Sequence, residues 1–101
     1  MAKSDVLAKL GRRYIEVRGI WIQSLTELER INLRGAWSKR YAALDEKDNE
    51  AKALHSDRSD AELLVSVIVD SEGGNRVFAD NEIDELRGVD SLMFSELVDA
   101  A

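Results

Sequence analysis

The pattern of hydrophobic and polar positions changes its period along the chain, and the first clear pattern is that of strands. Residues 13–25 contain two short runs rich in β-branched and aromatic residues, separated by Arg18 and Gly19. Two such runs around a short glycine-containing turn predict a β-hairpin. Arg-Gly is a weaker turn than Asn-Gly, because the arginine must adopt a positive φ. Since an isolated hairpin is only marginally stable, one of its faces should lie on helices.

A helical period begins directly after this hairpin. Thr26 and Glu29 form a capping box, in which the threonine oxygen accepts from the third amide and the glutamate reaches back. The residues that follow place four large apolar side chains on one helical face, namely Leu33, Trp37, Tyr41 and Leu44. We therefore expect a helix over residues 26–45.

A polar segment and then the most apolar run of the chain follow. Residues 46–58 are polar with weak periodicity, which indicates a linker or a frayed extension of the preceding helix. Residues 63–69, Leu-Leu-Val-Ser-Val-Ile-Val, have strand propensity. However, Ser59 and Glu62 form a second capping box just before them, and the run contains apolar pairs at i, i+4 spacing. These two signals favour a buried helix that starts at Ser59.

The last third of the chain predicts a turn and two short helices. Gly73 and Gly74 should reverse the chain, and Asp80 and Asp90 can each cap a helix. The final helix carries an apolar face at helical spacing, made of Met93, Phe94, Leu97, Val98 and Ala101.

Together these patterns predict one mainly α domain (α+β) over residues 1–101, with a small N-terminal β-hairpin packed on about four helices. In chain order we expect an N-terminal segment (1–12) with a short helix capped by Ser4, the hairpin (13–25), a helix (26–45), a polar linker (46–58) and a helix–turn–helix–helix unit (59–101).

Composition and charge narrow the class of protein. The chain has no Cys, which excludes disulfides and thiol ligands, and no apolar run approaches the ~20 residues needed to cross a bilayer. We therefore expect a soluble protein that acts in the cytosol and not at a membrane. The net charge of −6 is unevenly spread: residues 1–41 hold nine Lys/Arg and four Asp/Glu, and residues 42–101 hold five and sixteen. Such a split indicates either a basic binding face or two solvated faces that attract each other or a neighbouring copy.

No residue pattern predicts a catalytic or metal site. Residues 70–81 are similar to an EF-hand calcium loop, but Gly74, Asn75 and Asn81 stand where a ligand, the turn glycine and the bidentate glutamate are required. His55 is the only histidine, in the polar segment, and we expect it to be solvated. The carboxylate pairs lie in polar stretches, where solvated helix faces are expected. We therefore expect no enzyme, no cofactor and no bound metal.

The basic first part of the chain raises one alternative. Arginines interleaved with Tyr14, Trp21, Trp37 and Tyr41 are a composition that can bind nucleic acid by phosphate contacts and base stacking. The aromatic residues lie at core spacings, however, and the remainder of the chain is strongly acidic. Nucleic-acid binding is therefore the less favoured hypothesis.

Two segments together carry a resemblance to a known family. The first, residues 14–30, runs from a short β segment directly into Leu-Thr-Glu-Leu-Glu-Arg. The second, residues 63–80, is an apolar run ending in Val-Asp, then a glycine turn, a Phe and an Asp, followed by an acidic helix and a Leu-Arg-Gly break. This order resembles the tail assembly chaperones of long-tailed bacteriophages, over roughly residues 14–100.

The resemblance implies a non-enzymatic protein that binds the tape measure protein, helps to recruit tail tube subunits and is not retained in the mature virion. It implies action in the host cytoplasm, with self-association left open. The candidate client-binding strips are one on the 26–45 helix and one on the last helix, made of Trp37 and Tyr41, and of Met93, Phe94, Leu97 and Val98. The alternatives are a structural head–tail connector or tail completion protein, and a small nucleic-acid-binding regulator.

Overall fold

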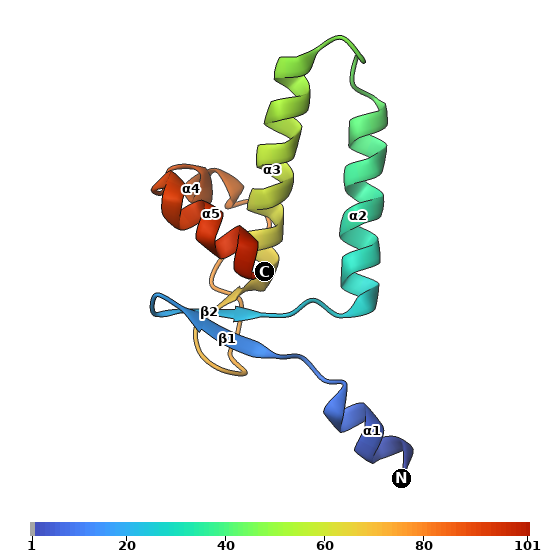
Figure 1. Cartoon of the computed structure of the whole chain (residues 1–101), viewed down its shortest axis with the longest axis vertical. Helices are drawn as coiled ribbons and strands as arrows, with labels where there is room; N and C mark the ends of the chain where they lie inside the picture. The colour runs from blue at the N-terminus through green and yellow to red at the C-terminus, as the bar shows by residue number, and fades with distance from the viewer. Residues whose placement is uncertain (1) are drawn as a thin grey trace.

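A computed structural model describes residues 2–101 and is mainly helical with a small antiparallel sheet, which confirms the predicted fold class. The sheet is formed by β1, β2 and β3, and the helices of the described residues are α1 to α5 (Figure 1). Their bounds are α1 Lys3–Lys9, β1 Tyr14–Val17, β2 Ile20–Gln23, α2 Glu27–Ala42, α3 Asn49–Val67, β3 Ile68–Val69, α4 Ile83–Arg87 and α5 Ser91–Ala100.

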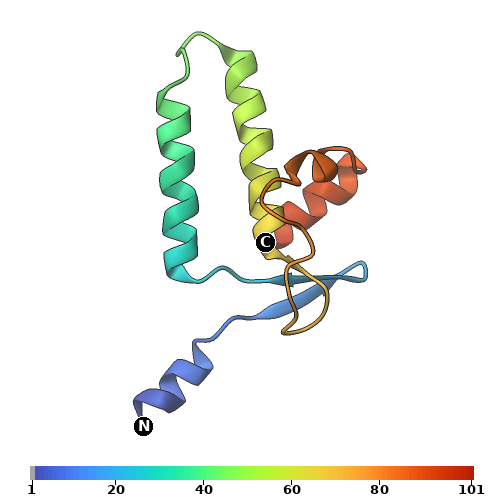
Figure 2. The same cartoon turned by 180° about the vertical axis from the view of Figure 1, so that it is seen from behind.

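The elements form a long helical hairpin that stands on the sheet. Helices α2 and α3 run antiparallel, the sheet crosses their base, and α4 and α5 pack beside the C-terminal half of α3 (Figures 1 and 2). Helix α1 projects from the opposite side of the base, away from the rest of the chain (Figures 1 and 2). The molecule is consequently elongated, with extents of 53 × 29 × 21 Å.

The predicted hairpin is confirmed, and its turn has the expected strain. Strands β1 and β2 pair antiparallel around Arg18 and Gly19, whose φ angles of 50° and 81° are both positive. Two positive φ angles are characteristic of a type I′ turn. The side chain of Arg18 compensates in part, because its guanidinium donates two hydrogen bonds to the Glu96 carboxylate on α5 at 2.5 and 2.9 Å. The turn is thereby tied to the last helix.

The apolar run of residues 63–69 contains both structures that its sequence allows. It is helical to Val67, as predicted, and then Ile68 and Val69 form a short third strand, β3, on the outer edge of β2. The sequence prediction missed this strand. Its physical basis is that β2 offers unpaired backbone groups at that edge, which two β-branched, buried residues satisfy.

The predicted polar linker of residues 46–58 is wrong over most of its length. Asp48 caps the helix by accepting from the Ala51 amide at 2.9 Å, and α3 runs from Asn49 without interruption. The predicted cap at Ser59 is also wrong, since Ser59 is a buried mid-helix residue whose hydroxyl accepts from Arg40 at 3.1 Å. A helix with one polar half and one apolar half was thus mistaken for a linker and a shorter helix.

Of the four other predicted helix caps, two are confirmed and two are wrong. The Thr26 capping box has both of its bonds, and Asp90 accepts from the Met93 amide at 3.1 Å. Asp80 does not cap α4, because its carboxylate instead accepts from Arg76 at 2.6 Å, and Ser4 lies inside α1 without a capping bond.

The core lies where α3 meets the sheet, α4 and α5. Its buried residues come mostly from the second half of α3 and from β2 and β3, with one leucine from each of the last two helices, namely Ile22, Ala61, Leu64, Val65, Val67, Ile68, Val69, Leu86 and Leu97. Helix α2 contributes no buried residue. The fold is therefore a compact base from which the α2–α3 hairpin extends.

Candidate functional site

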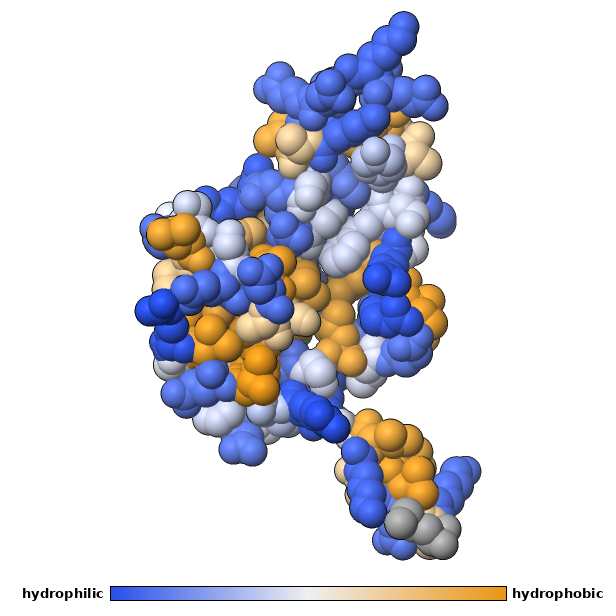
Figure 3. All heavy atoms as spheres, viewed as in Figure 1, coloured by the Kyte–Doolittle hydropathy of each residue, from blue (hydrophilic) through white to orange (hydrophobic). Residues whose placement is uncertain are grey.

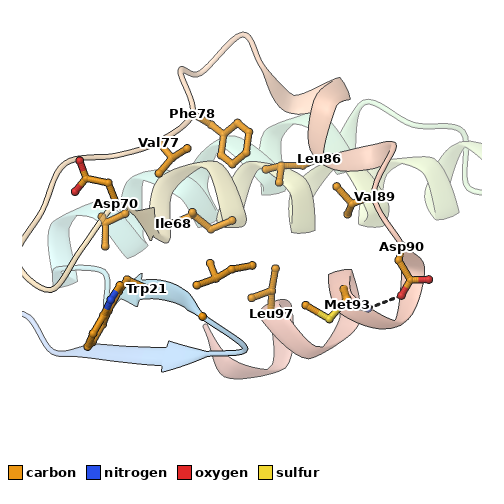
Figure 4. A pocket seen from close by; sticks show the side chains of 13 residues that line it. Trp21, Ile68, Asp70, Val77, Phe78, Leu86, Val89, Asp90, Met93 and Leu97 are labelled. Atoms are coloured by element: carbon orange, nitrogen blue, oxygen red, sulfur yellow. Dashed lines mark hydrogen bonds between the residues drawn. The ribbon is translucent and has the colours of Figure 1, made fainter.

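A hollow with a largely apolar lining lies between the sheet and the last two helices. It has a volume of about 530 Å³, which is within the range of small-ligand and side-chain binding sites. Its wall is formed by 13 residues, namely Gly19, Ile20, Trp21, Ile68, Val69, Asp70, Val77, Phe78, Leu86, Val89, Asp90, Met93 and Leu97. We call this hollow the apolar pocket (Figure 4).

Two walls face each other across the pocket. One is formed by β2 and α5, which contribute Trp21, Met93 and Leu97, and the other by the extended segment after the glycine turn and by α4 (Figure 4). That segment is held against the sheet because the Val77 amide donates to the Ile68 carbonyl at 3.2 Å. The pocket therefore depends on the turn at Gly73, whose positive φ of 73° allows the chain to return along β3.

The polar groups of the pocket are two aspartates at its opposite ends, Asp70 and Asp90 (Figure 4). One oxygen of Asp70 accepts from the Asn75 amide at 3.1 Å, and one oxygen of Asp90 accepts from the Met93 amide. Within residues 2–101 neither carboxylate has an ion-pair partner. The pocket is thus an apolar hollow with negative charge at both ends.

The structure divides the predicted strip on the last helix. Met93 and Leu97 line the pocket, while Phe94 and Val98 pack against the core cluster. Leu97 is only 4% exposed, so it serves the core as well as the pocket wall. The part of the strip that an incoming group can contact is therefore centred on Met93, and it is extended by Val89, which is 44% exposed.

The predicted strip on α2 does not line this pocket. Trp37 is half-buried against α3, where its indole N–H donates to the Glu62 carboxylate at 3.2 Å. Tyr41 is 48% exposed and packs edge-on against His55, with ring centroids 5.5 Å apart. The expectation of a solvated His55 is wrong, because its Nε2 lies 3.0 Å from the Trp37 carbonyl oxygen and is partly buried. These residues hold α2 to α3.

Sequence reasoning identified only two of the 13 residues that line the pocket, Met93 and Leu97. The residues that it missed include Trp21, Val77 and Val89. Trp21 and Val77 lie 56 positions apart and are brought together by the β2–β3 pairing, which no local pattern reveals. A usable signal was the return of the chain after Gly73, since a segment that returns antiparallel to an apolar run places its own apolar residues beside that run.

Neither a cluster of metal-ligating side chains nor a membrane-spanning helix is found among residues 2–101. In the loop after β3, the Asp70 carboxylate is used within the turn, because it accepts from Ser71 as well as from Asn75. No group of three or more His, Asp or Glu side chains among residues 2–101 is placed to hold a metal ion. No helix in this part of the chain is long and apolar enough to span a bilayer.

Most arginines of the first half are engaged in ion pairs, whereas its three lysines have no such partner within residues 2–101. Four of the six arginines in residues 1–41 form ion pairs with carboxylates, namely Arg12, Arg18, Arg30 and Arg40. Glu29 shows the effect most clearly, since its hydrogen bond from Arg12 lowers the pKa of the carboxyl to about 2, assisted by the Thr26 cap. A face whose cations are already paired offers less free charge to phosphates.

Comparison of the chain with known protein families, with curated proteins and with solved structures gives no match.

Proposed function

We propose that this protein is a tail assembly chaperone of a long-tailed bacteriophage, and that it binds the tape measure protein through the apolar pocket. The proposal rests on the position of the two segments that carry the family resemblance, because both of them line the pocket. Eight of the 13 residues that line the pocket belong to residues 14–30 and 63–80, the segments on which the resemblance rests. The residue order that resembles the family is thus the order that builds the pocket.

The pocket chemistry supports a binding function of this kind. Its lining is apolar apart from Asp70 and Asp90, whose carboxylates each hold a backbone amide in place. An apolar hollow with negative ends favours a helical client segment whose apolar side chains are followed by Lys or Arg. Met93 suits such a role, because a flexible thioether side chain adapts to different apolar partners.

The proposed role places the protein in the host cytoplasm during assembly. By binding apolar segments of a long client it keeps them from aggregating, and its net charge of −6 helps to keep the complex soluble. Recruitment of tail tube subunits belongs to the same proposal. The protein is then expected in assembly intermediates and absent from purified virions.

Co-expression with the tape measure protein of the same phage tests the proposal. We expect the wild-type chain to raise the soluble fraction of that protein and Val89→Asp, which puts a charge into the pocket, to lose most of this effect. Ile31→Asp is the matched control, because Ile31 is also exposed, at 54%, but lies on α2 away from the pocket. A tape measure protein equally insoluble with and without the wild-type chain would sink the proposal. Detection of the chain in purified virions would favour a structural tail component instead.

A further inference from the structure

A second hollow lies between α2, α3 and α4, and all of its polar side chains are basic. It has a volume of about 300 Å³ and is lined by three arginines, one histidine, two leucines and one alanine. The basic residues are Arg40 from α2, His55 and Arg58 from α3, and Arg87 from α4. No carboxylate lines this hollow, and it shares no lining residue with the apolar pocket. We call it the arginine hollow.

Carboxylates outside the arginine hollow hold its three guanidinium groups in place. Arg40 Nη1 and Arg58 Nε both donate to the Glu62 carboxylate, at 2.5 and 3.1 Å. Arg87 Nε donates to the Asp57 carboxylate at 2.7 Å. Because these bonds fix the side chains without using all of their N–H groups, the remaining donors are already positioned for a ligand.

The donors that remain come from all three helices. Arg58 donates only through Nε, which leaves both of its Nη groups, and Arg87 Nη2 donates to no residue in the range 2–101. These two side chains are 54% and 35% exposed, so a ligand can reach them. The Nε of Arg40 is buried without a hydrogen-bond partner in the same range. The hollow thus presents arginine donors that the chain itself does not satisfy.

The arginine hollow also keeps an excess of positive charge. Arg40 and Arg58 share one carboxylate, that of Glu62, so one of their two charges is not offset. Arg87 has a close partner in Asp57, at 2.7 Å. Its second carboxylate neighbour lies 3.5 Å away and is 95% exposed, so water screens that charge. Three arginines against two close carboxylates therefore favour an anionic ligand.

We propose that the arginine hollow binds the phosphate group of a small phosphate monoester. A phosphate group carries three acceptor oxygens and a charge of about −1.5 to −2 at neutral pH, which suits several guanidinium donors better than a carboxylate does. Leu44 and Leu54 also line the hollow, and Leu54 is 53% exposed, so a small organic group has an apolar surface to contact. The volume is at the lower end of small-ligand sites, which favours a compact monoester.

Such a ligand would join α2, α3 and α4 in a polar part of the molecule. Figure 3 shows apolar atoms gathered over the base and over α1, whereas the outer end of the α2–α3 hairpin is mostly hydrophilic. Since α2 has no buried residue, the hairpin would be stabilised by an added polar contact. The inference goes beyond the proposed function and does not depend on it, because the two hollows have separate linings.

Isothermal titration calorimetry of the full chain with phenyl phosphate, at constant ionic strength, tests the inference. We expect saturable binding that is tighter than the binding of inorganic phosphate, because only the monoester contacts the leucines. Acetate has fewer oxygens and a smaller charge, and it should bind about tenfold more weakly or less. Saturating phenyl phosphate should also raise the melting temperature, because it binds the folded chain only.

Two variants and a matched control locate the site. Arg58→Gln and Arg87→Gln should each weaken phenyl phosphate binding about tenfold, the loss expected for one hydrogen bond to a charged group. Arg34→Gln is the control, because it removes the same charge from an exposed residue of α2 that does not line the hollow. It should bind like the wild type. Melting temperatures without ligand establish that each variant is folded.

Three results would overturn the inference. The first is a wild-type chain that binds neither phenyl phosphate nor inorganic phosphate. The second is an equal loss of binding in Arg34→Gln and Arg58→Gln, since the attraction would then belong to the basic surface in general. The third is a single-stranded oligonucleotide that binds through Arg58 while phenyl phosphate does not. Inorganic phosphate that binds as tightly as phenyl phosphate overturns the monoester assignment in favour of the free anion.

Discussion

Replacing Glu62 by glutamine tests whether polar contacts, and not apolar packing, hold α2 against α3. The Glu62 carboxylate accepts from Trp37 Nε1 at 3.2 Å, from Arg40 Nη1 at 2.5 Å and from Arg58 Nε at 3.1 Å. Helix α2 has no buried residue that would replace these bonds. Loss of the Glu62 charge should therefore loosen the whole helical hairpin.

The size of the effect follows from the burial of the pair. The side chains of Arg40 and Glu62 are 24% and 17% exposed, and the Nε of Arg40 is buried without a hydrogen-bond partner. Hydrogen bonds to charged groups contribute about 1.5–3 kcal/mol, and stranding one partner of a fully buried pair costs about 3–5 kcal/mol. Because both side chains keep some contact with water, we expect Glu62→Gln to lower the free energy of unfolding by about 2 kcal/mol.

Urea unfolding followed by far-UV circular dichroism measures this loss. The control is Glu27→Gln, which breaks the exposed Glu27–Arg30 pair within α2. Exposed ion pairs on a helix surface contribute little to stability, so the control should unfold almost like the wild type. If the two variants lose equal stability, the Glu62 contacts do not hold the hairpin and the reasoning is refuted.

Three further predictions concern single side chains. Burial, and then two nearby aspartates, raise the pKa of Asp60; its charge therefore destabilises the fold at neutral pH, so Asp60→Asn should raise the melting temperature at pH 7 and lose this advantage at acidic pH, where Asp60 is protonated. The pKa of Glu29 is lowered to about 2 by Arg12, so its contribution is complete above pH ~4.5 and is lost as the pH falls through about 2; after discounting for exposure, Glu29→Gln should cost about 1 kcal/mol at pH 7 and much less as the pH approaches 2. Arg18→Asn should raise the urea midpoint of unfolding, because Asn adopts the positive φ of 50° at this position more readily than Arg and the ion pair that is lost is exposed; a lower midpoint would show that the Glu96 bond contributes more.

The sequence predicts those elements whose signals are local. The type I′ hairpin, the Thr26 capping box and the Asp90 cap each depend on residues within four positions of one another, and all three are present. The cap predicted at Ser59 failed because α3 already begins at Asn49, so Ser59 lies in the middle of a helix and its hydroxyl accepts from Arg40 instead. A capping motif is therefore informative only where the residues before it are not already helical.

The pocket could not be predicted from local sequence patterns, because its wall is formed by segments that lie far apart in the chain. The last helix was correctly identified as amphipathic, but which of its apolar residues are core and which are accessible depends on the position of α4 and β3. Leu97 packs inward against the core, whereas Met93 faces the hollow that Val77 and Trp21 complete. Both positions have the same hydrophobic signal, so only the tertiary arrangement separates them.

The basic residues of the first half fall into two groups. Some of them meet the acidic half, as in the Arg18–Glu96 and Arg40–Glu62 pairs. Lys3 and Lys9 on α1 and Lys39 on α2 have no carboxylate partner within residues 2–101. Neither of these two helices has a buried residue. The unmatched lysines therefore lie on the helices that contribute least to the core, where solvent can hydrate their charge.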